Sequence, residues 1–371
     1  MDFTKKGAVK AQKELVSKLP RNRRKFSISF FKALLVLILA FVIVGVGAGF
    51  GALKGILDDT PNVNAEALIP TGYKTKLVYQ NGKEITTLAN FNSNREYVYY
   101  DSIPTDLVNA FVAIEDRRFW EHNGIDVQGI ARAFIQGLSK GDFDEGASTL
   151  TQQLIKNNVF NVGLNETTFL QSLERKVQEQ YLAVEMEKQI SKEHIVEYYL
   201  NTIYLGQGCY GVETAAKNYF DKDLSQLSVS ECTVLASIPQ NPSKYDPIVY
   251  PEENAKRRKM VLKYMLDLEY ITKAQYDEAL NDKVYDRIAK ISKKDSEEEK
   301  TEVNSYYTDE VIKQLQSDLE AKGYSEEDAE TMIWSGGLKV IVCQDPEIQE
   351  IADSVVNDAS YWPEPVYQLN Y

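Results

Sequence analysis

The sequence is poor in the residues that build metal centres and disulfide frameworks. It contains three cysteines, at wide and unpatterned spacing, and two histidines. An odd number of cysteines excludes a complete disulfide framework, and two histidines do not supply a histidine-rich metal centre. We therefore expect the cysteines to be small apolar core residues; they are Cys209, Cys232 and Cys343.

The chain also lacks a basic excess and the composition of a fibrous protein. Lys and Arg number 42 against 55 Asp and Glu, a net charge of −13, which argues against binding to nucleic acid. Glycine (20) and proline (11) are too few for a collagen-like chain. A hydrophobic content of 43% suffices for packed cores, and 371 residues allow about two or three domains.

What is present is a marked separation of charge along the chain. Residues 1–32 carry ten basic and two acidic side chains, a net charge of +8, so the remainder carries −21. Residues 33–53 are 21 consecutive uncharged positions, which as a helix would span about 31 Å, the thickness of a bilayer core. This predicts a transmembrane helix at 33–53. A cleaved signal peptide, the alternative, has a shorter basic region and a shorter apolar stretch.

The basic segment also predicts an orientation. Lys and Arg concentrate on the cytoplasmic side of membrane-spanning helices. Residues 1–32 are therefore predicted to be a cytoplasmic tail, and everything after about residue 54 is expected to lie outside the cell. We expect a single-pass protein of the plasma membrane with an external body.

Residues 54–100 are predicted to form a stalk or a small β segment. Short β-like runs at 76–79 and 97–100 lie on either side of the turn Asn81-Gly82. An Asn-Gly pair between such runs favours a hairpin.

Residues 101–285 have helical periodicity throughout and are predicted to form one all-α catalytic domain. Its longest helix is expected at 169–189. Residues 286–304 are almost entirely charged or polar and are interpreted as a linker. Residues 305–371, with a helix followed by a strand-like run from Leu338, are expected to begin an α+β unit.

Several helix starts in this region carry local signals. Ser228 and Glu231 have the spacing of a capping box, as do Thr272 and Gln275. Pro251 suits the first turn of the segment that follows it. These positions predict three further helices.

The first candidate for chemistry is the segment from Glu115 to Gly124, E-D-R-R-F-W-E-H-N-G. A carboxylate at the end of an apolar helix, beside Asp116 and bulky rings, suits a general acid or base. Taken alone, the segment is better explained as an ordinary charged helix end.

The second candidate is the segment from Gly146 to Leu154, G-A-S-T-L-T-Q-Q-L, with Lys156 two residues on. We expect Ser148 to be a helix N-cap. A helix N-terminus with hydroxyl, amide and ammonium donors can hold a phosphate. The alternative is a capped helix with a polar face.

The third candidate is Arg175-Lys176-Val177-Gln178-Glu179, within the long helix. Glu179 lies four residues after Arg175 and three after Lys176, so the three share one helix face. A structural ion pair is the usual reason for this spacing. Two cations beside a carboxylate would also neutralise a diphosphate leaving group.

The order of these motifs carries more information than any one of them. E-D-x-x-F-x-x-H-x-G, G-x-S-T-x-T-Q-Q-L and R-K-x-x-E are followed by Tyr199-Leu200-Asn201, Tyr210-Gly211-Val212, Tyr245-Asp246-Pro247 and Arg257-Arg258. Over about residues 85–285 this resembles the peptidoglycan glycosyltransferase domain (family 51) of class A penicillin-binding proteins. The N-terminal anchor and outward topology are similar to that family as well.

The resemblance implies a mainly α fold: one transmembrane helix, a lysozyme-like helical glycosyltransferase domain, and the start of an α+β linker and transpeptidase region. It implies polymerisation of lipid II into glycan strands, with inversion and release of undecaprenyl diphosphate. The implied partners are lipid II, the growing glycan strand and the membrane, with cell-wall synthesis or division proteins as further candidates and no nucleic acid.

The resemblance also implies roles for individual residues. Glu115 matches the general base, which takes the proton of the acceptor sugar's 4-hydroxyl, and Glu179 matches the second essential glutamate, on the diphosphate side. No cofactor is required by the resemblance, although a divalent cation, Mg²⁺ or Mn²⁺, is a candidate at the diphosphate. The positions matched as substrate-binding are Asp116, Phe119, His122, Gly124, Ser148, Thr149, Gln152, Gln153, Lys156, Arg175 and Lys176.

Three departures from the family pattern are visible. Leu164 stands where an arginine is expected about eight positions after Lys156, and Asp221 replaces a glycine. Transpeptidases of this family use S-x-x-K and K-T-G motifs, but the only S-x-x-K here is Ser29–Lys32 and no K-T-G exists. We therefore expect the transpeptidase to be absent from these 371 residues and the sequence to be the N-terminal part of a bifunctional protein.

Two other functions fit parts of the pattern. A lysozyme-like glycan hydrolase also needs an acidic residue on a helical fold, but it does not need the cations around Glu179. A non-catalytic scaffold for cell-wall synthesis would not need Glu115 and Glu179.

Overall fold

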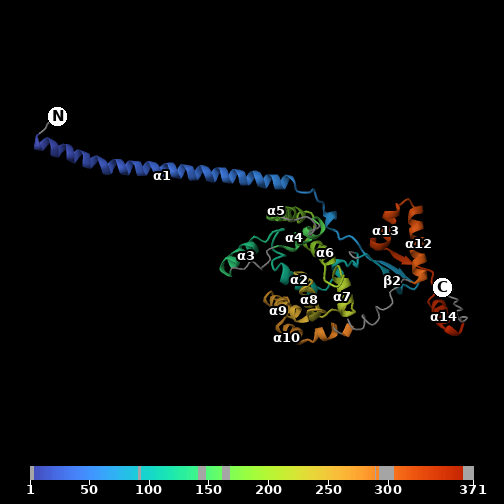
Figure 1. Cartoon of the computed structure of the whole chain (residues 1–371). Coiled ribbons are helices and arrows are strands. Elements are labelled where there is room, and N and C mark those ends of the chain that lie inside the picture. Colours follow the sequence, from blue (N-terminus) through green and yellow to red (C-terminus); the bar gives the residue numbers. More distant parts are fainter. Residues whose placement is uncertain are drawn as a thin grey trace, which may run out of the picture. The chain divides into compact units, whose positions relative to one another are not determined.

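The computed structural model describes residues 4–90, 93–140, 148–160, 168–288, 290–291 and 305–361. The chain divides into two compact units, which we describe separately. One comprises Met1–Asn62 with Phe169–Gln178, and the other Val63–Thr168 with Glu179–Tyr371. Figure 1 shows the elements in chain order.

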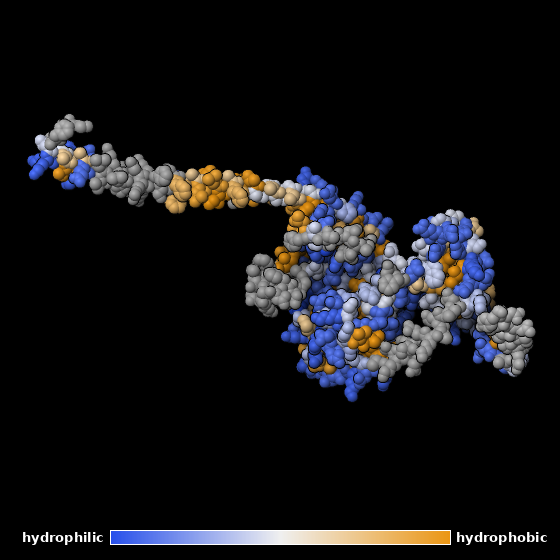
Figure 2. Space-filling view, viewed as in Figure 1, coloured by the Kyte–Doolittle hydropathy of each residue, from blue (hydrophilic) through white to orange (hydrophobic). Residues whose placement is uncertain are grey.

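The first unit is dominated by one long helix, α1 (Lys5–Asp58). The Thr4 side chain accepts a hydrogen bond from the Gly7 N–H and so caps its start. Residues 30–58 are long and apolar enough to cross a membrane, and among the described residues no other helix is. Figure 2 shows the apolar side chains as a band along α1, where they are exposed. The predicted helix at 33–53 is confirmed and is part of a longer one.

The helix α5 (Phe169–Met186) contributes to both units. Within the first unit the Gln178 Nε2 donates a hydrogen bond to the Ile56 carbonyl of α1, at 3.2 Å. Among the described helices of residues 101–285, α5 is the longest, with 18 residues against 17 for α9, as predicted, although it ends at Met186 and not at residue 189.

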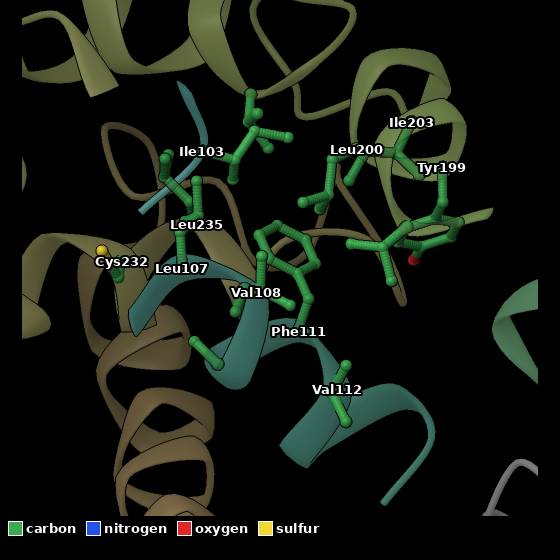
Figure 3. Close-up of a cluster of buried hydrophobic side chains, with 14 of the residues drawn as sticks. Ile103, Leu107, Val108, Phe111, Val112, Tyr199, Leu200, Ile203, Cys232 and Leu235 are labelled. Atoms are coloured by element: carbon green, nitrogen blue, oxygen red, sulfur yellow. The ribbon is translucent and has the colours of Figure 1, made fainter. Parts of the chain in front are cut away.

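The core of the second unit is built around α2 (Thr105–Glu115), which packs against α8 (Val229–Ala236) and α9 (Pro251–Asp267). Figure 3 shows Val108 and Phe111 of α2 turned toward Leu200 of α6 (Lys192–Thr202) and Ile203, which directly follows α6, with Leu107 beside Leu235 of α8. All are almost completely buried. Phe111 also meets the Tyr199 ring edge to face, with 6.3 Å between ring centroids.

Local capping signals set the helix starts around this core. The predicted capping boxes Ser228/Glu231 and Thr272/Gln275 are present, and Pro251 is the first residue of α9. The remaining helices are α3 (Val127–Lys140), α4 (Leu150–Asn158), α7 (Val212–Phe220), α10 (Lys273–Asn281), α12 (Tyr306–Ala321), α13 (Glu326–Ser335) and α14 (Pro346–Asn357). The 3₁₀ turns are Ala65–Leu68, Tyr100–Ser102, Leu224–Gln226 and Ala359–Tyr361.

A small sheet joins segments from both ends of the second unit. β1 (Thr75–Val78) pairs antiparallel with β2 (Glu84–Leu88) across the predicted Asn81-Gly82 turn, and parallel with β3 (Lys339–Ile341). The helix α13 packs against this sheet. Their shared core consists of Leu77, Leu88, Leu319, Ala329 and Ile333.

The second β-like run, at 97–100, is not a strand, and Tyr100 begins a 3₁₀ turn. Its backbone donors are taken by side chains of α6. The Val98 N–H donates to the Asn201 Oδ1 at 2.9 Å, and the Tyr100 N–H donates to the Glu197 Oε2 at 2.7 Å. These two N–H groups are therefore not available to a strand ladder.

The fold class is confirmed as mainly α, with a long apolar helix at the N-terminal end and a small α+β part formed by β1–β3, α12 and α13. Cys209 and Cys232 are buried, as expected, whereas Cys343, two residues after the edge strand β3, is exposed, so the expectation was wrong for Cys343. Of the predicted linker, residues 292–304 lie outside the described residues.

Candidate active site

Glu115 is the last residue of α2, and both of its carboxylate oxygens are held. The Arg257 Nη2, from α9, lies 3.2 Å from Oε1. The Gln153 Nε2, from α4, donates a hydrogen bond to Oε2 at 3.1 Å. The Glu115 side chain is 11% exposed, so it is largely buried without being closed off from solvent.

The other end of the Gln153 amide is also held by a hydrogen bond. The hydroxyl of Tyr199, on α6, donates to the Gln153 Oε1 at 3.3 Å. Tyr199 is completely buried. Burial raises the pKa of Tyr199 well above its ordinary value and the Glu115 charge raises it further, so the phenol stays neutral.

Asp116 fastens the turn after α2 to the start of α4. Its buried carboxylate accepts from the His122 Nε2 at 2.9 Å and from the Leu150 N–H at 3.0 Å. Leu150 is the first residue of α4, where the helix dipole favours a negative charge. This bond sets the position of α4, and hence of Gln153, relative to Glu115.

Phe119 and His122 form a packed layer behind Asp116. Both are buried, and their rings meet edge to face at 6.0 Å. The Lys192 ammonium lies 4.2 Å from the centre of the Phe119 ring and 3.4 Å from the His122 Nδ1. It also forms an ion pair with Glu187 at 2.8 Å. His122 therefore links this layer to Asp116.

Gly124 lies in the loop between α2 and α3, where it contacts α5 and is hydrogen-bonded by Thr149 at the start of α4. Gly124 has φ +88°, and a Cβ there would stand 2.6 Å from the Ala183 backbone of α5, so a larger residue does not fit. The Thr149 hydroxyl donates to the Gly124 carbonyl at 2.8 Å. Thr149 and Gln152 also form the capping box of α4, so the expectation that Ser148 caps this helix was wrong.

Ser148 and Lys156 are half-buried at opposite ends of α4. Lys156 lies in the last turn, three residues after Gln153, and so on the same side of the helix. Leu164, the position that lacks the expected arginine, lies outside the described residues.

The third motif lies on α5. Arg175 and Lys176 are half-buried and belong to the first unit, whereas Glu179 belongs to the second and is completely buried. Each of the three has at least one interaction partner. The second unit by itself brings together Glu115, Asp116, Phe119, His122, Gly124, Thr149, Gln152 and Gln153.

Arg257 and Tyr199 contact this site but were not among the predicted site residues. Both belong to the motifs quoted for the resemblance, Arg257-Arg258 and Tyr199-Leu200-Asn201. Nothing in their local sequence shows that they meet Glu115 or Gln153. A partly exposed carboxylate, with each oxygen fixed by a donor, suits proton transfer with a bound substrate.

The chain is similar to several known proteins. Residues 81–266 match the family described as Transglycosylase. Penicillin-binding protein 1A of Streptococcus oralis is 34% identical over 334 residues, 89% of this chain and 49% of that protein. Penicillin-binding protein 1F of Bacillus subtilis is 37% identical over 289 residues, 78% of this chain and 37% of that protein. The chain thus spans half or less of the length of these relatives.

A crystal structure of penicillin-binding protein 1A from Haemophilus influenzae aligns with 77% of this chain and 29% of that one. The TM-score is 0.38 and the sequence identity 22%.

Proposed function

Because this chain belongs to the transglycosylase family, we propose that it is a peptidoglycan glycosyltransferase that polymerises lipid II. The family match covers residues 81–266, half of the chain. The proposed reaction joins disaccharide units into a glycan strand, inverts the anomeric carbon of the donor and releases undecaprenyl diphosphate.

The observation that carries the proposal is the environment of Glu115. Arg257 and Gln153 fix its two oxygens, at 3.2 and 3.1 Å, and 11% of the side chain is exposed. We assign Glu115 as the general base that takes the proton of the acceptor's 4-hydroxyl while that oxygen attacks the donor.

The leaving diphosphate needs charge neutralisation on the other face of the donor sugar. We assign this task to Lys156, Arg175 and Lys176, with Ser148 as a hydroxyl donor. Glu179 is proposed to act on the same side. Support comes from the family motif and from the helical spacing of Arg175, Lys176 and Glu179 on α5.

The proposal allows for a divalent cation bound by a single carboxylate. No group of three or more His, Cys, Asp and Glu side chains able to hold a metal ion occurs among the described residues. Mg²⁺ is often held by one carboxylate together with substrate phosphates and water. Glu179 is the residue proposed to hold it, and the cation would add positive charge beside the diphosphate.

We further propose that α1 anchors the enzyme in the plasma membrane, with residues 1–32 in the cytoplasm and the catalytic unit outside. The +8 charge of that segment supports this orientation. It also places the enzyme in the membrane that holds its lipid-linked substrate. Penicillin binding is not part of the proposal, because the only S-x-x-K of the sequence is Ser29–Lys32 and K-T-G is lacking.

The proposal is tested by giving the purified full chain, in detergent, either lipid II or preformed glycan strands. We expect glycan polymer from lipid II and no cleavage of the strands. Release of muropeptides without polymer would identify a hydrolase instead. No turnover of either substrate by folded protein supplied with Mg²⁺ would indicate a scaffold.

A further inference from the structure

Gln153 lies between Glu115 and Tyr199, in a line that crosses three helices. The Tyr199 hydroxyl of α6 contacts the Gln153 Oε1 at 3.3 Å, and the Gln153 Nε2 of α4 contacts the Glu115 Oε2 at 3.1 Å. Both polar ends of the Gln153 amide are therefore occupied within the protein.

Hydrogen bonding fixes which way this amide points. A carboxylate only accepts hydrogen bonds, so the amide must present its NH₂ to Glu115 and its oxygen to Tyr199. The phenol can supply the matching donor because burial keeps it protonated. The charged carboxylate thus sets which way the Gln153 amide faces, and Tyr199 holds the other end of that amide.

We propose that Gln153 and Tyr199 are positioning residues for the catalytic base, and that Gln153 acts through Glu115 and not by contacting the substrate. This inference rests on the proposed glycosyltransferase function. Arg257 alone holds one oxygen and leaves the carboxylate free to rotate about its terminal torsion. The second donor, from a different helix, fixes the plane of the carboxylate.

Gln153, held by Tyr199, can form a hydrogen bond with Glu115 whether Glu115 is charged or protonated. When Glu115 takes up the acceptor's proton, the new carboxylic O–H needs an acceptor in place of a donor. The Gln153 amide can turn over so that Oε1 accepts from Glu115 while Nε2 donates to the Tyr199 oxygen, since a hydroxyl both donates and accepts. A lysine or arginine in place of Gln153 could only donate hydrogen bonds, so it would stabilise only the charged form of Glu115.

The test is a double-mutant cycle on the full chain, with kcat and KM for lipid II as readouts. Tyr199→Phe removes one oxygen and keeps the buried ring, and Gln153→Met keeps the length of the side chain while removing both polar groups. Tyr219→Phe is the matched control, because the Tyr219 hydroxyl is also buried but donates to the Leu205 carbonyl, at 2.7 Å. Thermal unfolding of every variant reports the structural cost.

We expect Tyr199→Phe to lower kcat by about 3- to 10-fold, Gln153→Met by at least as much, and KM to be unchanged in both. In the double variant kcat should equal that of Gln153→Met alone, because Tyr199 acts only through Gln153. Tyr219→Phe should lower the unfolding temperature without lowering kcat.

Two results would overturn the inference: a raised KM with unchanged kcat in Gln153→Met, which indicates a substrate contact, or additive losses in the double variant. Glu115→Gln, measured beside them, separates this inference from the proposed function. If Glu115→Gln is inactive while Tyr199→Phe behaves like Tyr219→Phe, the positioning role alone is wrong. If Glu115→Gln polymerises normally, the base assignment fails and the positioning role with it.

Discussion

Arg257 and Glu115 are 142 residues apart in the sequence and form an ion pair with 3.2 Å between Nη2 and Oε1. Both side chains are about nine-tenths buried. Removing one partner of a buried ion pair leaves the other buried without a counter-charge, which is costly. The packing of α9 against α2 therefore holds the proposed base in place.

Arg257→Gln should lower the rate of lipid II polymerisation by about tenfold or more, because the buried carboxylate loses its counter-charge and one hydrogen bond. Steady-state assays of the purified chain measure this. Lys259→Gln, which removes an exposed cation from the same helix, is the control and should polymerise normally. Equal rates for the two variants would show that the ion pair has no role in the reaction.

Glu179→Gln should reduce polymerisation by roughly 100-fold or more, because an amide of the same shape cannot supply the charge proposed at the diphosphate. The comparison is Glu185→Gln on the same helix, whose side chain is 35% exposed and pairs with Lys188. That variant should keep the wild-type rate. A Glu179→Gln enzyme within about twofold of wild type would remove the assigned role.

Gly124→Ala should destabilise the catalytic unit by roughly 2–5 kcal/mol, since it combines backbone strain with overlap against α5. The added Cβ would lie 2.6 Å from the Ala183 backbone at φ +88°. Gly208→Ala, at φ +69° with no atom within 4 Å of the added Cβ, should cost only about 1 kcal/mol. Denaturant unfolding of the two variants tests the difference, and equal costs would contradict the close approach.

Glu96 is expected to make the stability of the second unit depend on pH. Burial raises the pKa of Glu96, but hydrogen bonds from Lys76 of β1 and Lys217 of α7 outweigh it and lower the pKa from 4.5 to about 2. A depressed folded-state pKa stabilises the protein above pH 4.5, and this stability is lost as the pH falls from 4.5 toward 2.

The expected loss over that range is about 1–3 kcal/mol, allowing for solvent screening. Unfolding free energies measured between pH 6 and pH 3 should fall more steeply for the wild type than for Glu96→Gln. Parallel curves would show that the contacts of Glu96 with Lys76 and Lys217 contribute little.

Features with local causes could be predicted from the sequence. The capping boxes at Ser228 and Thr272, the start of α9 at Pro251 and the β1–β2 turn all depend on neighbouring residues. The apolar helix at 33–53 could be predicted because its signal, a run of consecutive uncharged residues, is also local. The prediction of a β-like run at 97–100 was wrong because the N–H groups of Val98 and Tyr100 donate to side chains of α6, about 100 residues away.

The candidate site was predictable as a set of residues but not as an arrangement. The family motif identified Glu115, Asp116, His122 and Gln153. Their spacing along the chain does not show that Asp116 bonds the first N–H of α4, or that Arg257 lies beside Glu115. Such contacts depend on how α2, α4 and α9 pack. The parallel pairing of β1 with β3 could not be predicted from the sequence either, because the two strands are far apart along the chain.

The most direct test of the central claim is the rate of lipid II polymerisation by Glu115→Gln in the full chain. The amide keeps the shape of the side chain but cannot accept the acceptor's proton. We predict a loss of at least about 100-fold in kcat, with unchanged thermal unfolding and unchanged KM. Polymer formed at the wild-type rate by this variant would contradict the assignment of Glu115 as the base.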